Sequence, residues 1–461
     1  MLFNSLKFAL FLPVVFAVYW LLRGSLRWQN LFVVAASYFF YACWDARFLC
    51  LIAGVSAMAW ASGLLLGSTR RQAARRAVLW ANVALNLGVL ALFKYHDFFA
   101  AELARLLGLP PERWVLGLVL PVGISFYTFQ ALSYTVDVYR RTVQPTRDAA
   151  AFFAYVSFFP QLVAGPIERA DSLLPQFLKP RSFNREAAVQ GLRLMLWGMF
   201  KKVVVADRCA LYVDAVFADP SRFGGGTLAA AAVLFAIQIY ADFSGYSDLA
   251  IGCARLFGIG LRRNFATPYF ATGMADFWRR WHMSLTSWLR DYVYLPLGGS
   301  RRGRWRTVAN TFVVFLLSGL WHGAGWTFVL WGLYHAVLFT PGLLTGRRQR
   351  REASARTLPL CVLTFLLATA GWVIFRSPST GFALHYFAGL AHGGEWLATG
   401  WHAPLAAAAM MAVEWAGRHR ADGLPALPRS RAARWALYCL LLFIILTMQP
   451  TGEMPFIYFQ F

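Results

Sequence analysis

One histidine in the sequence has a setting that suits chemistry. His322 lies in the glycine- and tryptophan-rich segment 318–326, inside an apolar run over residues 308–339. Glycines on both sides allow another backbone or a ligand to approach closely. A neutral imidazole can act as a general base near neutral pH, and burial favours the neutral form. A hydrogen-bonded packing histidine is the alternative. The glycine-rich setting beside Trp321 favours a functional role.

A second candidate lies in segment 276–292, which predicts one amphipathic helix. At about 100° per residue, His282 falls at the seam between an aromatic face and a cationic face. Tryptophan and arginine anchors of an interfacial helix explain this pattern as a whole but not the position of His282. Arg279 lies beside it on the cationic face. The aromatic face comprises Trp278, Trp281, Leu285, Trp288 and Tyr292.

Two further segments place polar residues between apolar runs. Asp242 lies in segment 238–248, where its carboxylate can orient a histidine or pair with an arginine. A structural ion pair is an equally good interpretation of Asp242. Proline and glycine in segment 159–169 predict a broken helix, which at membrane depth is tolerated only where protein or a cavity surrounds it.

Neither a bound cofactor nor a metal ion is expected. The sequence contains no glycine-rich phosphate loop, no histidine and cysteine cluster with metal-ligand spacing, and no nucleophile elbow. The cysteines lie scattered, mostly within apolar runs, which is typical of core packing. They are Cys43, Cys50, Cys209, Cys253, Cys361 and Cys439.

The elements that carry these residues are predicted to be membrane helices. Of the 461 residues, 59% are hydrophobic and only 14% are charged, whereas soluble chains carry about 25% charged residues. A helix needs about 20 mostly apolar residues to cross a bilayer, and the apolar runs predict about ten to thirteen membrane segments in an all-α polytopic protein. Arg23 and Arg27 follow the first run, as in an uncleaved anchor.

The formal charge of +23 does not indicate nucleic-acid binding, because the basic residues cluster between apolar runs. This is the positive-inside pattern of membrane proteins. It predicts cytoplasmic loops around residues 70–76, 140–147, 347–351 and 418–431, and an external segment over 377–417, with both termini outside. A basic cytoplasmic face suits anionic membrane lipids or an acidic donor.

The chain reads as a single membrane domain over residues 1–461, without an evident repeat. Residues 1–150 are expected to form scaffold helices, 151–340 the catalytic core, and 341–461 the closing helices and the C-terminal tail. Polar, aromatic and glycine residues interrupt the apolar runs mainly in the middle part, and such groups are costly in a membrane unless they face its protein interior.

The chain resembles the membrane-bound O-acyltransferase family, and within it the bacterial alginate O-acetylase-like branch. The resemblance lies in five segments that occur in the same order: 1–5, 159–169, 240–248, 278–299 and 319–332. The resemblance implies a ring of helices around a tunnel, with His322 as the catalytic histidine. His282 matches a second polar position, where many relatives carry asparagine. The implied activity moves an acetyl group from a cytoplasmic donor, acetyl-CoA or an acyl carrier, across the bacterial inner membrane.

The same resemblance implies an acceptor and a partner. The acetyl group would reach an exopolysaccharide or a cell-wall glycan through an extracytoplasmic acetyltransferase. The competing hypothesis is a transporter or flippase for a lipid-linked sugar, since intramembrane polar residues and broken helices fit that class as well. A transporter predicts inverted repeats, which the sequence does not show.

The C-terminal segment supplies one more candidate, Tyr458. An interfacial aromatic anchor explains the aromatic residues there, because tyrosine favours that depth. The spacing Phe456-x-Tyr458-x-x-Phe461 also resembles the C-terminal tyrosine motif of the small membrane partner in teichoic-acid D-alanylation. That likeness implies an acyl relay, in which the Tyr458 hydroxyl carries the acetyl group onward.

Overall fold

A computed structural model describes residues 1–162, 165–345, 352–420, 423–449, 454 and 456–457. Within these ranges the secondary structure is helical, apart from one isolated bridge between Phe223 and Glu395. The all-α prediction is therefore confirmed. The chain divides into two compact units: unit 1 contains Met1–Met195 and Ser247–Arg262, and unit 2 contains Leu196–Tyr246 and Arg263–Phe461.

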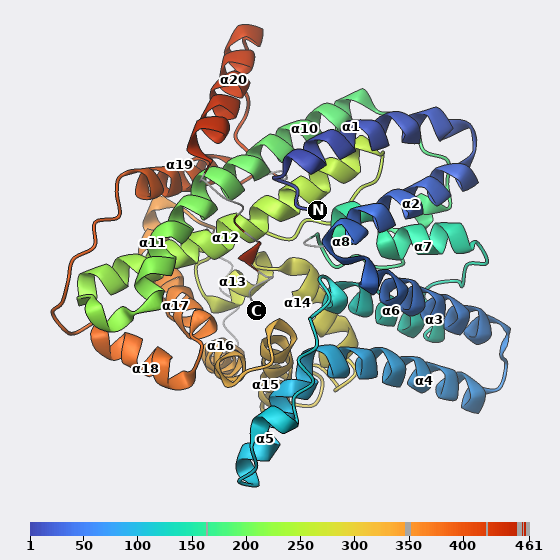
Figure 1. Cartoon of the computed structure of the whole chain (residues 1–461), viewed down its shortest axis with the longest axis horizontal. Coiled ribbons are helices and arrows are strands. Elements are labelled where there is room, and N and C mark those ends of the chain that lie inside the picture. The colour runs from blue at the N-terminus through green and yellow to red at the C-terminus, as the bar shows by residue number, and fades with distance from the viewer. Residues whose placement is uncertain (163–164, 346–351, 421–422, 450–453, 455, 458–461) are drawn as a thin grey trace. The chain divides into compact units, whose positions relative to one another are not determined.

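In unit 1, α3 packs against α4, α6 and α7, and α4 also packs against α6. Figure 1 shows α3, α4 and α6 lying side by side. The helices of unit 1 are α1 (Leu6–Leu21), α2 (Leu26–Asp45), α3 (Leu49–Ser68), α4 (Gln72–Leu90), α5 (His96–Leu106), α6 (Ile124–Tyr139), α7 (Ala149–Ser157), α8 (Phe159–Leu162), α9 (Leu174–Phe177) and most of α10 (Arg185–Met199).

The broken helix predicted in segment 159–169 is confirmed. Helix α8 ends at Leu162, and residues 165–169 form no regular helix. The backbone N–H of Gly165 still donates to the carbonyl of Gln161 at 3.1 Å. Gln161 and Glu168 are both buried, so this irregular segment lies within the protein of unit 1, as a broken helix at membrane depth requires.

Unit 2 is organised around the helical hairpin of α15 and α16, which Figure 1 shows side by side. Glycines bring the two helices together: a methyl group at Gly319 would overlap the carbonyl oxygen of Phe328, and one at Gly332 would overlap that of Phe315. The helices of unit 2 are α11 (Asp207–Ala218), the greater part of α12 (Gly225–Leu256), α13 (Met274–Arg280), α14 (Met283–Leu289), α15 (Arg304–His322), α16 (Trp326–Thr345), α17 (Leu358–Arg376), α18 (Thr380–Gly389), α19 (His402–Gly417) and α20 (Arg431–Met448).

Seven helical stretches among the described residues are long and apolar enough to cross a membrane. They are Leu6–Gly24, Leu26–Ser68, Gln72–Leu106, Gly225–Leu256, Trp326–Thr345, Ala355–Arg376 and Arg431–Met448. The protein is therefore a multi-pass membrane protein. The number is lower than the ten to thirteen expected, partly because neighbouring apolar runs join into stretches of 43 and 35 residues. Another expected run, residues 115–134, becomes helical only from Ile124.

Candidate active site

His322 is the last residue of α15. The apolar run 308–339 is thus two helices and not one, because the backbone becomes extended at Gly323 (φ −164°). A side chain at Gly323 would overlap the ring of Phe328, so a larger residue at this break would require that ring to move. The His322 side chain is buried. Its ring centroid lies 5.0–5.3 Å from those of Trp321, Trp331 and Phe375.

His282 lies in a break between α13 and α14, so the prediction of one continuous helix over 276–292 was wrong. Its backbone is left-handed, with φ 42° and ψ 54°, a conformation that costs a non-glycine residue about 1–2 kcal/mol. Backbone hydrogen bonds to a distant loop hold the break open. Met283 N–H donates to the carbonyl of Asn264 at 2.8 Å, and Ala266 N–H donates to that of Arg280 at 2.9 Å. The helical periodicity of the sequence does not predict these long-range hydrogen bonds.

Asn264 sets the orientation of the His282 ring. Its side-chain oxygen Oδ1 lies 3.0 Å from Nδ1 of His282, and it also accepts from the backbone N–H of Ser284 at 3.3 Å. Because a carbonyl oxygen only accepts, Nδ1 of His282 carries the proton and Nε2 holds the lone pair. Nε2 is buried without a hydrogen-bond partner among the described residues. Burial lowers the pKa of His282 to about 3, which keeps the ring neutral.

The two histidines, 40 positions apart in the sequence, come together in unit 2. Their ring centroids lie 6.3 Å apart. Trp321 contacts both rings, with centroid distances of 5.0 Å to His322 and 5.6 Å to His282. The Phe243 ring also contacts His282, at a centroid distance of 4.7 Å. Two buried imidazoles in an aromatic setting form an arrangement that can take a proton from a hydroxyl group and pass it on.

Asp242 pairs with a lysine and not with a histidine or an arginine. Its carboxylate lies 3.0 Å from Nζ of Lys202, which also pairs with Asp207 at 2.7 Å. All three side chains are buried. The carboxylate of Asp242 also accepts from the backbone N–H of Ile457 at 2.7 Å. The ion-pair interpretation of Asp242 is therefore correct, and the carboxylate additionally holds the segment that precedes Tyr458.

Arg279 lies beside a cavity. It pairs with Asp276 at 3.3 Å and lines a largely apolar cavity of about 410 Å³ bounded by α13, α14, α15 and α16. Ser318 lines the same cavity one helical turn before His322. Trp278, also in the cavity wall, contacts Trp331, which in turn contacts His322. Two side chains, Trp278 and Trp331, thus connect the cavity to His322.

Tyr458 lies outside the described residues, whereas Phe456 and Ile457 are described and buried. The Phe456 ring packs 4.5 Å from Tyr246 and 5.9 Å from Phe243. Among the described residues, no group of three or more metal-ligating side chains is arranged to hold an ion.

Three residues of this site were not predicted as candidates: Asn264, Phe243 and Lys202. Phe243 follows Asp242 directly in a segment that the sequence already singled out. Asn264 lies 18 residues before His282, in a loop without a recognisable local pattern. Lys202 lies in a helical segment with i→i+5 bonding (Phe200–Ala206), a rare form that often marks functional sites.

Comparisons with known proteins identify the family. Residues 144–369 match the model of the membrane-bound O-acyltransferase family. The chain is 40% identical to a probable alginate O-acetylase AlgI of Azotobacter vinelandii, over 86% of this chain and 79% of that protein. It is 36% identical to a probable alginate O-acetylase AlgI of Pseudomonas putida over the full length of both. A peptidoglycan O-acetyltransferase of Helicobacter pylori is 34% identical over 85% of this chain and 80% of that protein.

Proposed function

Because the chain belongs to the membrane-bound O-acyltransferase family, and is therefore an O-acyltransferase, we propose that it moves acetyl groups across the membrane for the O-acetylation of a glycan outside the cytoplasm. An exopolysaccharide of the alginate type is the first candidate acceptor, and a cell-wall glycan is the second. The names of the relatives, alginate O-acetylase and peptidoglycan O-acetyltransferase, support both acceptors and the acetyl group. The bacterial relatives also support a place in the inner membrane.

The main observation that supports acyl transfer is the pair of buried imidazoles, His322 and His282, whose ring centroids lie 6.3 Å apart. We assign His322 as the general base. It takes the proton of an attacking hydroxyl while the new ester C–O bond forms and the C–S bond of a thioester donor breaks. The proton then passes to the leaving thiolate, so that His322 ends neutral. A positioned base of this kind contributes about 10²–10⁴-fold.

His282 acts beside this base as a hydrogen-bonding group. Its Nδ1–H is held by Asn264, so the lone pair on Nε2 has a fixed direction. The neutral state of the ring suits an acceptor for a hydroxyl proton. An asparagine can also accept a hydrogen bond, which is consistent with relatives that carry asparagine at this position.

The donor is proposed to be acetyl-CoA or an acetylated acyl carrier on the cytoplasmic side. A tunnel through a ring of helices would let the acetyl group cross while its polar carrier stays behind. The cavity of about 410 Å³ beside Ser318 falls within the usual size range of small-molecule sites, about 300–1,000 Å³. It supports a donor arm that approaches His322 along α15.

Tyr458 is proposed to be the first acceptor of the acetyl group. The preceding Phe456 and Ile457 are both buried, and the Phe456 ring contacts Phe243, which contacts His282; this supports the role of Tyr458. The phenol loses its proton to His322 and becomes an acetyl ester. Its ordinary pKa of about 10 keeps it protonated at neutral pH, which is why a base is needed. An extracytoplasmic acetyltransferase would then take the acetyl group from the phenol ester to the glycan.

The proposal is tested by measuring two quantities in cells that lack this protein and in cells complemented with it. One is ester-linked acetate per sugar in the glycan outside the cytoplasm, released by mild alkali. The other is the total amount of that glycan. An acetyltransferase changes acetate per sugar and leaves the exported amount unchanged. A lipid-linked sugar transporter would lower the exported amount and leave acetate per sugar unchanged, and that result would refute the proposal.

A further inference from the structure

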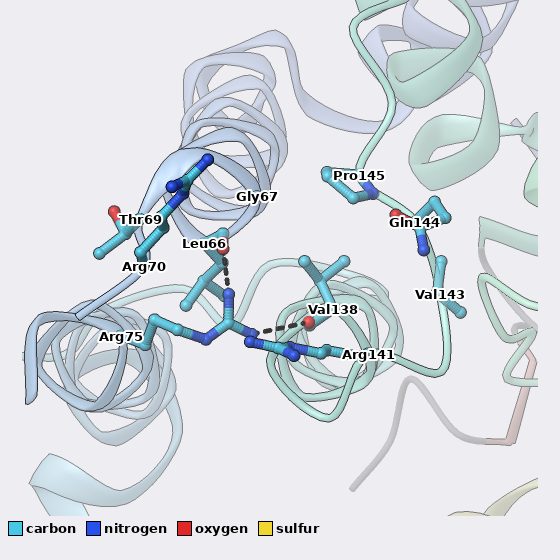
Figure 2. A pocket seen from close by; sticks show the side chains of 10 residues that line it. All are labelled: Leu66, Gly67, Thr69, Arg70, Arg75, Val138, Arg141, Val143, Gln144 and Pro145. Carbon is cyan, nitrogen blue, oxygen red and sulfur yellow. Dashed lines mark hydrogen bonds between the residues drawn. The ribbon is translucent and has the colours of Figure 1, made fainter. Parts of the chain in front are cut away.

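Unit 1 contains a polar pocket that the acetyl-transfer site does not use. It has a volume of about 240 Å³ and lies where the end of α3, the connection into α4 and the end of α6 meet. Three arginines line it, Arg70, Arg75 and Arg141, and none of the residues that line it is acidic. Figure 2 shows the side chains that surround the pocket, with Arg75 extending between the ends of two helices.

Arg75 is the fixed part of the pocket. It is buried and donates to the backbone carbonyls of Leu66, Val138 (3.3 Å) and Tyr139 (2.9 Å). These carbonyls lie in the last turns of α3 and α6, where helices favour cations. Arg75 therefore ties the two helix ends together and holds one wall of the pocket in place.

Arg141 is held by its backbone. It follows the C-cap of α6 with φ 63°, in the left-handed position that helices usually fill with glycine. Its N–H donates to the carbonyl of Val138 at 3.1 Å, and Thr142 N–H donates to that of Asp137 at 3.0 Å. These two bonds are those of a Schellman motif. An arginine at this position costs stability relative to glycine, which indicates that its side chain has a use.

The charge of the pocket is not neutralised by the protein. Neither Arg70 nor Arg141 has an ion-pair partner among the residues that the structure describes. Arg75 is bound by carbonyl groups that carry only partial charge. A planar guanidinium matches the oxygens of a phosphate group and binds them through paired hydrogen bonds. The pocket therefore has the composition of a phosphate site.

The position of the pocket indicates which phosphate is available there. The candidate span Leu26–Ser68 ends at the pocket, and the next, Gln72–Leu106, begins beside it. A phosphate bound here lies at the level of the lipid headgroups. The positive-inside pattern assigns this connection to the cytoplasmic leaflet, which is rich in anionic lipids. We propose that the pocket binds the phosphate headgroup of an anionic phospholipid through Arg70 and Arg141.

The test uses the full-length protein in uncharged detergent, titrated with dioctanoyl-phosphatidylglycerol and followed by native mass spectrometry. Arg70→Gln/Arg141→Gln should weaken binding about tenfold or more, because two charge-assisted contacts are lost. The matched control is Arg71→Gln/Arg76→Gln, which removes the same charge from neighbouring exposed arginines outside the pocket. The control should change the affinity by about twofold or less. Equal weakening in both variants would show only general surface attraction and would overturn the proposal.

Two further measurements test the remaining alternatives. Arg141→Gly keeps the Schellman backbone, so it should bind the lipid more weakly without a lower melting temperature. Wild-type binding by this variant would remove Arg141 from the site.

Competition with inorganic phosphate and with coenzyme A identifies the source of the phosphate. Failure of both to displace the lipid supports a headgroup site, whereas displacement by either at an equal concentration would assign the pocket to a soluble ligand.

Discussion

The histidine site of unit 2 and the arginine pocket of unit 1 position polar groups in opposite ways. The rings of His282 and His322 pack among aromatic side chains, and the hydrogen bond of His282 goes to a neutral asparagine. The pocket of unit 1 instead gathers three cations around an open space. An imidazole must be unprotonated to act as a base, and burial favours that neutral form, whereas an anion is held by fixed charge. Each region has the electrostatics that its proposed task requires.

Removing the proposed nucleophile should have the largest effect. Tyr458→Phe deletes only the hydroxyl that would receive the acetyl group, so acetate per sugar should fall to background. Phosphatidylglycerol binding should remain at the wild-type level, because the two regions do separate tasks. Membrane accumulation, measured by immunoblot, serves as the control. Normal acetylation in Tyr458→Phe would return this tyrosine to the role of an interfacial anchor.

The His282 series separates proton transfer from hydrogen bonding. His282→Ala leaves neither function, and acetate per sugar should fall by about 10²-fold. His282→Asn preserves a hydrogen-bond acceptor and should keep most of the activity. If both variants lose activity completely and equally, His282 is itself a proton carrier and its assignment as a hydrogen-bonding group is wrong.

Asn264→Ala should have a moderate effect on the same reaction. It leaves Nδ1–H of His282 buried without its acceptor, at a cost of about 1–3 kcal/mol. If about 1.4 kcal/mol of this cost raises the barrier to transfer, the transfer rate falls about tenfold. Asn82→Ala in unit 1 is the matched control, since Asn82 is also a buried asparagine that donates to side-chain and backbone oxygens. An equal loss in both variants would mean general destabilisation and not loss of ring orientation.

Salt and the pocket variants should have the smallest effect on acetylation. Raising the ionic strength to about 1 M shortens the Debye length to ~3 Å and should weaken lipid binding by the arginine pocket. The acetylation level of cells carrying Arg70→Gln/Arg141→Gln should stay within about twofold of the wild-type level, because the proposed proton transfer takes place at His322 in unit 2, which these substitutions leave unchanged. A loss of acetylation as large as that of the His282→Ala variant would show that the two regions do not work separately.

Local pattern in the sequence predicted most of the helices and the broken helix in segment 159–169, and it singled out both histidines as candidates. It could not predict what holds His282, because the bonds to Asn264 and Ala266 join a loop to the break between α13 and α14. A periodic pattern of aromatic residues indicated one helix there, and long-range hydrogen bonds overrode it. Lys202 was missed as the partner of Asp242 for the same reason, since the two lie 40 positions apart.

Burial alone does not single out the catalytic histidine. His335 on α16 is also fully buried and contacts Trp278 and Trp331 at 5.0 and 4.8 Å. It differs from His322 in its place: His335 lies within α16, whereas His322 ends α15 at a glycine break. The contact with His282 also belongs to His322. We assign the role of general base to His322 because of these two features, and not because of its residue type.

The most direct test of the account compares His322→Gln with His335→Gln, the same substitution at two buried histidines of one hairpin. Ester-linked acetate per sugar is measured in cells in which both variants accumulate in the membrane to the wild-type level. The account predicts a loss of about 10²–10⁴-fold for His322→Gln and near wild-type acetylation for His335→Gln. Wild-type acetylation in the His322→Gln variant would contradict the assignment of His322 as the base.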